Sequence, residues 1–187
     1  MIQESEDYPL SAQAARERAL EEARQLLSAM IYGASFTYVP PDAQRKTTEE
    51  FLLAPLAELK WGDRRLRIAQ AEVRDDRLFA RVRYDLEDFQ DARRRAWDSN
   101  SIPTSTASGR YSLFSGPAPE GKRRSLQEAL KQAVRAHLQP VLFNKPREVR
   151  GELLLWRPPR VIVDAGDYVT FLTVKLRVRE IRPYSLF

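Results

Sequence analysis

The chain has 187 residues, of which 43% are hydrophobic and 30% charged, so it is long enough to bury a core without a covalent or metal staple. It contains no cysteine, which excludes disulfide bonds and thiolate metal sites. No apolar run approaches the roughly 18 residues of a membrane-spanning helix, and the first ten residues are acidic and unlike a signal peptide.

Charge is divided unevenly along the chain. Residues 1–91 contain 13 Lys and Arg against 18 Asp and Glu, a net charge of −5, whereas residues 92–187 contain 18 against 8, a net charge of +10. Such a division is typical of a protein whose basic half meets an anionic partner. Ordinary surface charge explains it equally well, and composition alone leaves both interpretations open.

A long helix is predicted first. Ser11 is a suitable N-cap and Gly33 is a suitable stop. Between them apolar side chains recur at steps of three and four, which places them on one narrow, Ala-rich stripe. The stripe is formed by Ala12, Ala15, Ala19, Ala23, Leu26, Leu27, Met30 and Ala34.

A short strand and a second helix are expected next. Residues 34–39 alternate like a strand, which two prolines end. Thr47 and Glu50 have the spacing of a capping box. This box predicts a helix over residues 49–60, with a kink at Pro55.

A β-hairpin is predicted between residues 64 and 86, with its turn at residues 74–77. Apolar and polar side chains alternate along its second strand, which is typical of a sheet with one buried face and one basic, solvated face. The expected inner residues are Leu78, Ala80, Val82, Tyr84 and Leu86, and the expected outer residues are Phe79, Arg81, Arg83 and Asp85.

Within residues 87–124, the stretch from 99 to 121 is dense in Ser, Thr, Pro and Gly, so a long loop or linker is expected there. A second capping box, Ser125 with Glu128, predicts that a helix begins there. Pro140 is expected to stop that helix.

The last part of the chain is expected to be strands. Residues 147–156 form one strand, and residues 160–164 and 168–181 form a hairpin joined at 165–167. In the final strand Leu172, Val174, Leu176 and Val178 are expected to face the core, and Thr173, Lys175, Arg177 and Arg179 are expected to face outward.

The predicted order of elements is αβαββ, a loop, and then αβββ. Runs of hairpins with helices indicate the α+β class, in which antiparallel sheets carry helices packed on one face. We expect an αβαββ domain at residues 11–90, a linker at 91–124 and an αβββ half at 125–187. That half either stands alone or completes the first domain.

The sequence contains no recognisable set of catalytic residues. The only histidine, His137, lies near a predicted helix C-terminus, where the helix dipole favours it. As a general base it would need a nucleophile, which no motif supplies, and the glycines form no phosphate-binding loop. We therefore expect no enzymatic activity, no cofactor and no metal site. An enzyme with an unfamiliar site around His137 is the weaker alternative.

A basic, partly aromatic face is the candidate binding surface. Sheets that bind single-stranded nucleic acid combine positive charge with exposed rings, so nucleic acid or another anionic polymer is one expected partner. Basic side chains on outer strands also keep strand edges from pairing with other chains. The candidate residues are Arg81, Arg83, Trp156, Arg157, Arg160, Lys175, Arg177 and Arg179.

Residues 11–86 resemble a known domain pattern. A helix written AQAARERALEEARQLL runs into YGASFTYV, a second helix follows, and a hairpin is written LRIAQAEVRDDRLFARVRYDL. This order is similar to that of the N-terminal domain of flagellar-assembly protein T and of related small envelope lipoproteins. Pro55 inside the second helix and the Pro-Pro pair after the strand depart from the pattern.

The resemblance implies a non-enzymatic protein of the bacterial cell envelope, associated with the flagellum or another assembly, that binds other envelope proteins or copies of itself. It also implies a periplasmic or membrane-anchored location, with a leader or a lipid-anchoring cysteine upstream of Met1. The family offers no catalytic residue to carry over. A cytoplasmic protein that binds nucleic acid or an anionic polymer is the alternative.

Overall fold

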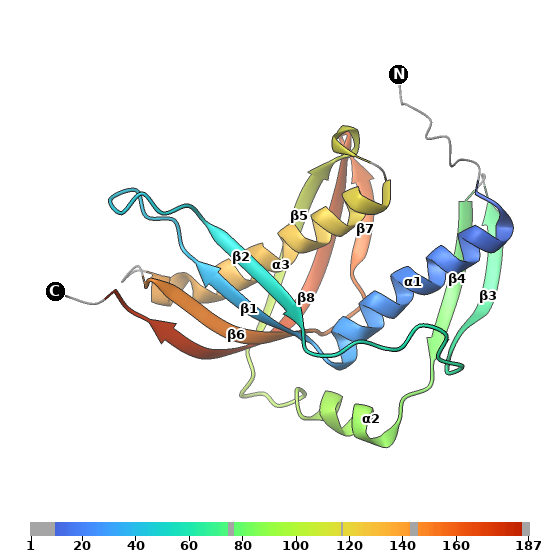
Figure 1. Ribbon diagram of the computed structural model, residues 1–187, viewed down its shortest axis with the longest axis horizontal. Helices are drawn as coiled ribbons and strands as arrows, with labels where there is room; N and C mark the ends of the chain where they lie inside the picture. Colours follow the sequence, from blue (N-terminus) through green and yellow to red (C-terminus); the bar gives the residue numbers. More distant parts are fainter. Residues whose placement is uncertain (1–9, 75–76, 117, 143–145, 185–187) are drawn as a thin grey trace.

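The computed structural model describes residues 10–74, 77–116, 118–142 and 146–184 (Figure 1). Within these ranges the chain forms three α-helices, one short 3-10 helix and eight β-strands. Every strand pairing among them is antiparallel. The predicted α+β class is therefore confirmed.

Six strands form the main sheet, in the order β2-β1-β6-β8-β5, with β7 also paired to β8. β6 and β7 follow one another along the same edge of the long strand β8. Because β1 pairs with β6, both halves of the sequence contribute to one sheet. The strands are β1 (Ala34–Val39), β2 (Glu50–Pro55), β5 (Thr104–Ser112), β6 (Glu148–Leu155), β7 (Arg160–Asp164) and β8 (Asp167–Arg182).

Helices cover one face of this sheet, as predicted. α3 (Ala118–Leu142) lies across β5 and β8, and the C-terminal end of α1 (Ala12–Ile31) joins the same hydrophobic core through Met30. Burial of each large apolar side chain stabilises such a core by about 1.5–3 kcal/mol. The buried members include Phe36, Tyr38, Val134, Leu138, Val149, Leu153, Leu155, Leu172, Val174 and Leu176.

The predicted long loop at residues 99–121, within the expected linker at 91–124, is wrong. Residues 87–124 contain α2 (Asp88–Arg95), all of β5, a 3-10 helix (Leu113–Ser115) and the start of α3. β5 runs directly under α3, so a β-carbon on Gly109 would lie 2.2 Å from the amide nitrogen of Ala129. Small residues such as Gly109, which suggest a loop in the sequence, are therefore needed in β5 because α3 approaches this strand closely.

The predicted helix at residues 49–60 is also wrong, because strand β2 pairs along its whole length with β1. Asp42 folds the connecting loop by accepting a hydrogen bond from the amide of Gln44 at 2.9 Å. Thr47 lies in an isolated bridge with Asp42 and caps no helix. Pro55, which has no amide proton, stands at the end of an edge strand, where proline is tolerated. Pairing with β1 thus outweighs the local helix signal.

α3 begins at Ala118, so Ser125 is not its N-cap as predicted. The hydroxyl of Ser125 is fully buried, donates to the carbonyl of Lys122 at 2.9 Å and shares a 2.7 Å hydrogen bond with the hydroxyl of Thr170. The helix also continues past Pro140, so the predicted stop is wrong.

The early start of α3 has a packing cause. A β-carbon on Gly121 would lie 2.6 Å from the ring of Tyr168 on β8. Glycine therefore lets the first turns of α3 lie against the sheet, although the same residue suggests a loop in the sequence.

A separate two-stranded ribbon packs against α1. It consists of β3 (Leu66–Arg74) and β4 (Arg77–Tyr84), as predicted, and side chains along β4 alternate between exposed and half-buried. The predicted turn includes Asp75 and Asp76, which lie outside the described residues. We call α1 residues 12–27 and this ribbon the outer arm; none of its described residues is fully buried. Figure 1 shows the outer arm diverging from α3 and the main sheet.

A candidate binding cleft between two helices

An open cleft of about 520 Å³ separates α1 from α3. Its apolar floor is formed by Leu26 and Ala29 of α1, Leu126 of α3 and Val161 of β7. Charged side chains surround this floor. Among the described residues the lining consists of Arg18, Glu21, Glu22, Gln25, Leu26, Ala29, Pro119, Glu120, Lys122, Arg123, Leu126, Pro159 and Val161. The cleft therefore combines an apolar base with a polar rim, as binding sites commonly do.

The carboxylates of the rim are all paired. Glu22 lies 3.6 Å from Arg18 on its own helix and 3.7 Å from Lys122 on α3, so it bridges the two walls. Hydrogen bonds from Arg24 are the main cause that lowers the pKa of Glu21, although burial opposes them.

On α3 the positive charges of the rim are not all paired with carboxylates. Glu120 pairs with Arg124 at 3.3 Å, whereas Arg123 is exposed and forms no ion pair with any described residue. The rim thus carries an uncompensated positive charge on its α3 side.

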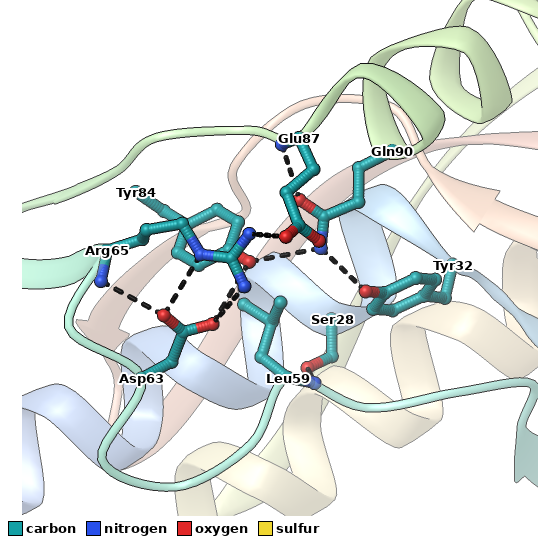
Figure 2. Close-up of polar contacts among 8 residues, drawn as sticks. All are labelled: Ser28, Tyr32, Leu59, Asp63, Arg65, Tyr84, Glu87 and Gln90. Atoms are coloured by element: carbon teal, nitrogen blue, oxygen red, sulfur yellow. Dashed lines mark hydrogen bonds and ion pairs between the residues drawn. The ribbon is translucent and has the colours of Figure 1, made fainter.

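A polar cluster holds the outer arm in place beside the sheet (Figure 2). Gln90 of α2 is only 1% exposed, and its amide nitrogen donates to the hydroxyls of Tyr32 (2.6 Å) and Tyr84 (3.0 Å). Its amide oxygen accepts from the backbone of Glu87 at 2.9 Å. One buried side chain thereby connects the end of α1, strand β4 and the start of α2.

Arg65 lies at the other end of this cluster. Its guanidinium donates to both oxygens of Asp63, at 3.0 and 2.8 Å, and also pairs with Glu87. The side-chain hydrogen bonds from Arg65, followed by its backbone amide, lower the pKa of Asp63 from 3.8 to about 2. Burial is the main cause that raises the pKa of Tyr84, whose hydroxyl donates to Asp63 at 3.4 Å. Since these groups satisfy one another, we interpret the cluster as a structural joint.

A second contact fixes the C-terminal half of α1. The hydroxyl of Ser28 donates to the carbonyl of Arg24 at 2.7 Å and accepts from the amide of Leu59 at 2.9 Å. Both Ser28 and Leu59 are buried. The chain that follows β2 is thus held to α1, so the helix that forms one wall of the cleft has a defined position.

The basic face predicted from the sequence is only partly solvated. Lys175 is 6% exposed, donates to the carbonyl of Ser99 at 3.2 Å, and lies 4.5 Å from the ring centroid of Trp156. Arg177 lies 4.3 Å above the ring of Trp97 and donates to the carbonyl of Ala96. The prediction that Lys175 faces solvent is therefore wrong. The segment after α2 covers it and builds a second small core of Trp97, Ile102, Leu154 and Trp156.

The remaining candidate residues do not gather on one sheet. Arg179 pairs with Glu152 at 3.0 Å. Arg81 and Arg83 lie on the separate ribbon, where Arg83 pairs with Asp85 at 3.0 Å. Arg157 and Arg160 are exposed beside the cleft, next to Pro159, and form no ion pair with any described residue.

His137 stands apart from any cluster of reactive groups. It is half-buried on α3, and burial lowers its pKa. Its side chain makes no hydrogen bond or ion pair with the described residues. Nor do the described parts of the chain bring three His, Asp or Glu side chains together in a group that could hold a metal ion. None of the helices in the described ranges is both long and apolar enough to cross a membrane.

The cleft itself is not predicted from the sequence. Leu126 resembles a core residue on the apolar stripe of its helix, and Val161 resembles an ordinary strand residue. Both lie at the cleft because α1, α3 and β7, which are far apart in sequence, each contribute residues to its lining. The only signal in the sequence is that the apolar stripe of the first helix is narrow and rich in alanine. This helix therefore has little apolar surface to bury.

A protein-family model matches residues 1–184. The chain belongs to that family. It is also similar to an uncharacterized protein of Treponema pallidum (strain Nichols), with 26% identity over 162 residues that cover 87% of this chain and 67% of the relative. No solved structure matches the chain significantly. These relationships place the chain in a family, and its function has to be argued from its geometry.

Proposed function

We propose that this chain is a non-enzymatic interaction module that holds a segment of another protein in the cleft between α1 and α3. The observation that carries the proposal is the composition of that cleft. Its floor is apolar and its rim is charged. The acid–base groups among its described lining residues, Glu21, Glu22, Glu120 and Lys122, are each held in an ion pair, whereas general acid–base catalysis needs a group that is available to the substrate. An apolar floor with a polar rim suits the capture of a polypeptide.

The form of the cleft favours a macromolecular segment over a small metabolite. Small-molecule sites enclose their ligand and present a few fixed polar groups. Here the polar groups are long rim side chains, such as Glu22 and Lys122, that already pair with each other. The cleft is also open to solvent, so a segment can enter it from the surface.

The cell envelope is the setting we propose, and the support for it is the resemblance of residues 11–86. The chain keeps the helix, the strand and the hairpin of that pattern as α1, β1 and the β3–β4 ribbon, and has strand β2 in place of the second helix. An assembly or anchoring role for the module fits both this resemblance and an open binding cleft.

Binding of nucleic acid or an anionic polymer is the second candidate. It rests on exposed cations that no described carboxylate neutralises, among them Arg81, Arg123, Arg157 and Arg160. The burial of Lys175 and the pairing of Arg179 with Glu152 weaken it. A gel shift that falls steeply with salt concentration would favour this candidate, provided that Arg81→Ala and Arg157→Ala also weaken it.

Site-specific photo-crosslinking in the source cells tests the proposal. A photoreactive phenylalanine replaces Leu126 in the cleft, and a matched control replaces Gln127, which is exposed on the same helix. We expect a discrete protein adduct from position 126 alone. After identification by mass spectrometry, the purified partner should bind the wild-type chain and bind Leu126→Glu at least tenfold more weakly. Equal adducts from both positions, or none from position 126, would refute the proposal.

A further inference from the structure

We infer that the occupant of the cleft is an extended, acidic and apolar segment of a partner protein that adds as an extra strand to the free edge of β7. This inference rests on the proposed function and specifies its binding mode. Addition of a strand to an open sheet edge is a common way to bind an extended peptide, because main-chain hydrogen bonds supply affinity and side-chain pockets supply specificity.

The free edge of β7 opens into the cleft. Among the described residues β7 pairs with β8 alone. The neighbouring strand β1 pairs with β6 only from Ala34, opposite Leu153, and the chain before it forms α1. No described strand therefore continues along β7. Val161 of β7 and the preceding Pro159 line the cleft.

The geometry of the β7–β8 turn identifies the backbone groups that are free. Ala165 and Gly166 have φ angles of 49° and 84°, as in a two-residue type I′ turn. Asp164 and Asp167 are then a hydrogen-bonded pair, and bonded and non-bonded pairs alternate along the hairpin. Val161 and Val163 are non-bonded positions, so their N–H and C=O groups point away from β8.

The side chains beside this edge require apolar residues at alternate positions of the added strand. Val161 is 38% exposed and Val163 is 60% exposed. Both lie on the same face of β7, and Leu26 and Leu126 continue the apolar surface into the cleft. An added strand that placed every second side chain on this face would cover all four residues.

Charge selects an acidic segment. The rim carboxylates already have cationic partners, whereas Arg123, Arg157 and Arg160 form no ion pair with any described residue. A second copy of this chain fits less well as the occupant, because the one carboxylate of its β7, Asp164, already pairs with Arg110 in its own chain and would leave Arg123 and Arg157 without acidic partners. The complementary partner is therefore a segment of another protein with Asp or Glu between its apolar residues.

A library of random ten-residue peptides, displayed on phage and selected on the full chain, provides the probe. We expect the selected peptides to alternate apolar with acidic residues. On binding, the amides of Val161 and Val163 should become protected from hydrogen exchange, whereas the amide of Ile162, which already faces β8, should be protected in both states. Val163→Pro, which removes one outward N–H, should lower affinity at least tenfold, and the matched Val163→Thr should not.

Two further variants separate charge from backbone pairing. The double variant Arg123→Glu with Arg157→Glu should lower affinity about tenfold, and Arg16→Glu on the exposed side of α1 should leave it unchanged. Peptides that bind while Val161 and Val163 stay unprotected, or that prove basic or helical, would overturn the inference and leave the proposed function standing. Failure to select any peptide would also overturn it, while the crosslinking result decides the proposed function separately.

Discussion

Gly109 lies so close beneath Ala129 that a β-carbon on the glycine would approach the amide nitrogen of Ala129 to 2.2 Å and the carbonyl oxygen of Ser125 to 2.4 Å. Both neighbours are backbone atoms of α3, which cannot rotate aside. The distance between α3 and the sheet is therefore set at this position, and so is the position of the cleft wall that α3 forms.

Substitution of Gly109 by alanine should force α3 away from β5. We expect Gly109→Ala to lower the free energy of unfolding by about 1–3 kcal/mol, the usual cost of overpacking, measured by urea denaturation. Ser108→Ala on the exposed face of the same strand should change it by less than about 0.5 kcal/mol. Equal effects of the two variants would contradict the close contact.

Removal of the amide of Gln90 should loosen the joint between α1, α2 and β4. Gln90→Met keeps the volume but leaves the hydroxyls of Tyr32 and Tyr84 without this partner, which costs about 1–3 kcal/mol in a buried setting. Hydrogen exchange should quicken in α2 and the ribbon more than in the middle of α3. Gln127→Met on the exposed face of α3 is the control.

The ion pair between Asp63 and Arg65 should make stability depend on pH. The pKa of Asp63 is lowered to about 2, so its stabilising effect is complete above about pH 5 and is lost as pH falls toward 2. Asp63→Asn should therefore be less stable than the wild type at pH 7, by about 1 kcal/mol or less because the pair is partly solvated. The difference should shrink below pH 4, as measured by urea denaturation at each pH. If the difference in free energy of unfolding between the wild type and Asp63→Asn grew as the pH fell, the stabilising role of the ionised Asp63 would be contradicted.

Trp97 should anchor the segment that covers Lys175 and Arg177. Trp97 is 3% exposed, so Trp97→Ala should lower the free energy of unfolding by about 3–5 kcal/mol. Trp61 is 58% exposed, and Trp61→Ala should change it little. If Trp97→Ala lowered the free energy of unfolding no more than Trp61→Ala does, the segment that contains Trp97 would not cover the sheet face of Lys175 and Arg177. Nucleic-acid binding at that face would then regain support.

Much of the fold follows from local patterns. The Ser11 cap, whose hydroxyl accepts from the amide of Ala14 at 3.1 Å, the alternation along β4 and the turn at Ala165–Gly166 all lie where the sequence predicts them. In each case the signal and the structure that it specifies lie within a few residues, so no distant contact has to be known.

The elements that the sequence misses depend on contacts between distant segments. β2 contains a proline and follows a helix-like capping pair, yet pairing with β1 decides its conformation. β5 is rich in small residues because α3 lies over Gly109, a contact that composition cannot reveal. The cleft is missed for the same reason, since it exists only through the relative placement of α1, α3 and β7.

Strand β8 also has a mechanical consequence. It is bonded to β6 and β7 along one edge and to β5 along the other. Tension applied near Tyr184, in line with this strand, would load those ladders in shear, so that many bonds share the force instead of opening one after another.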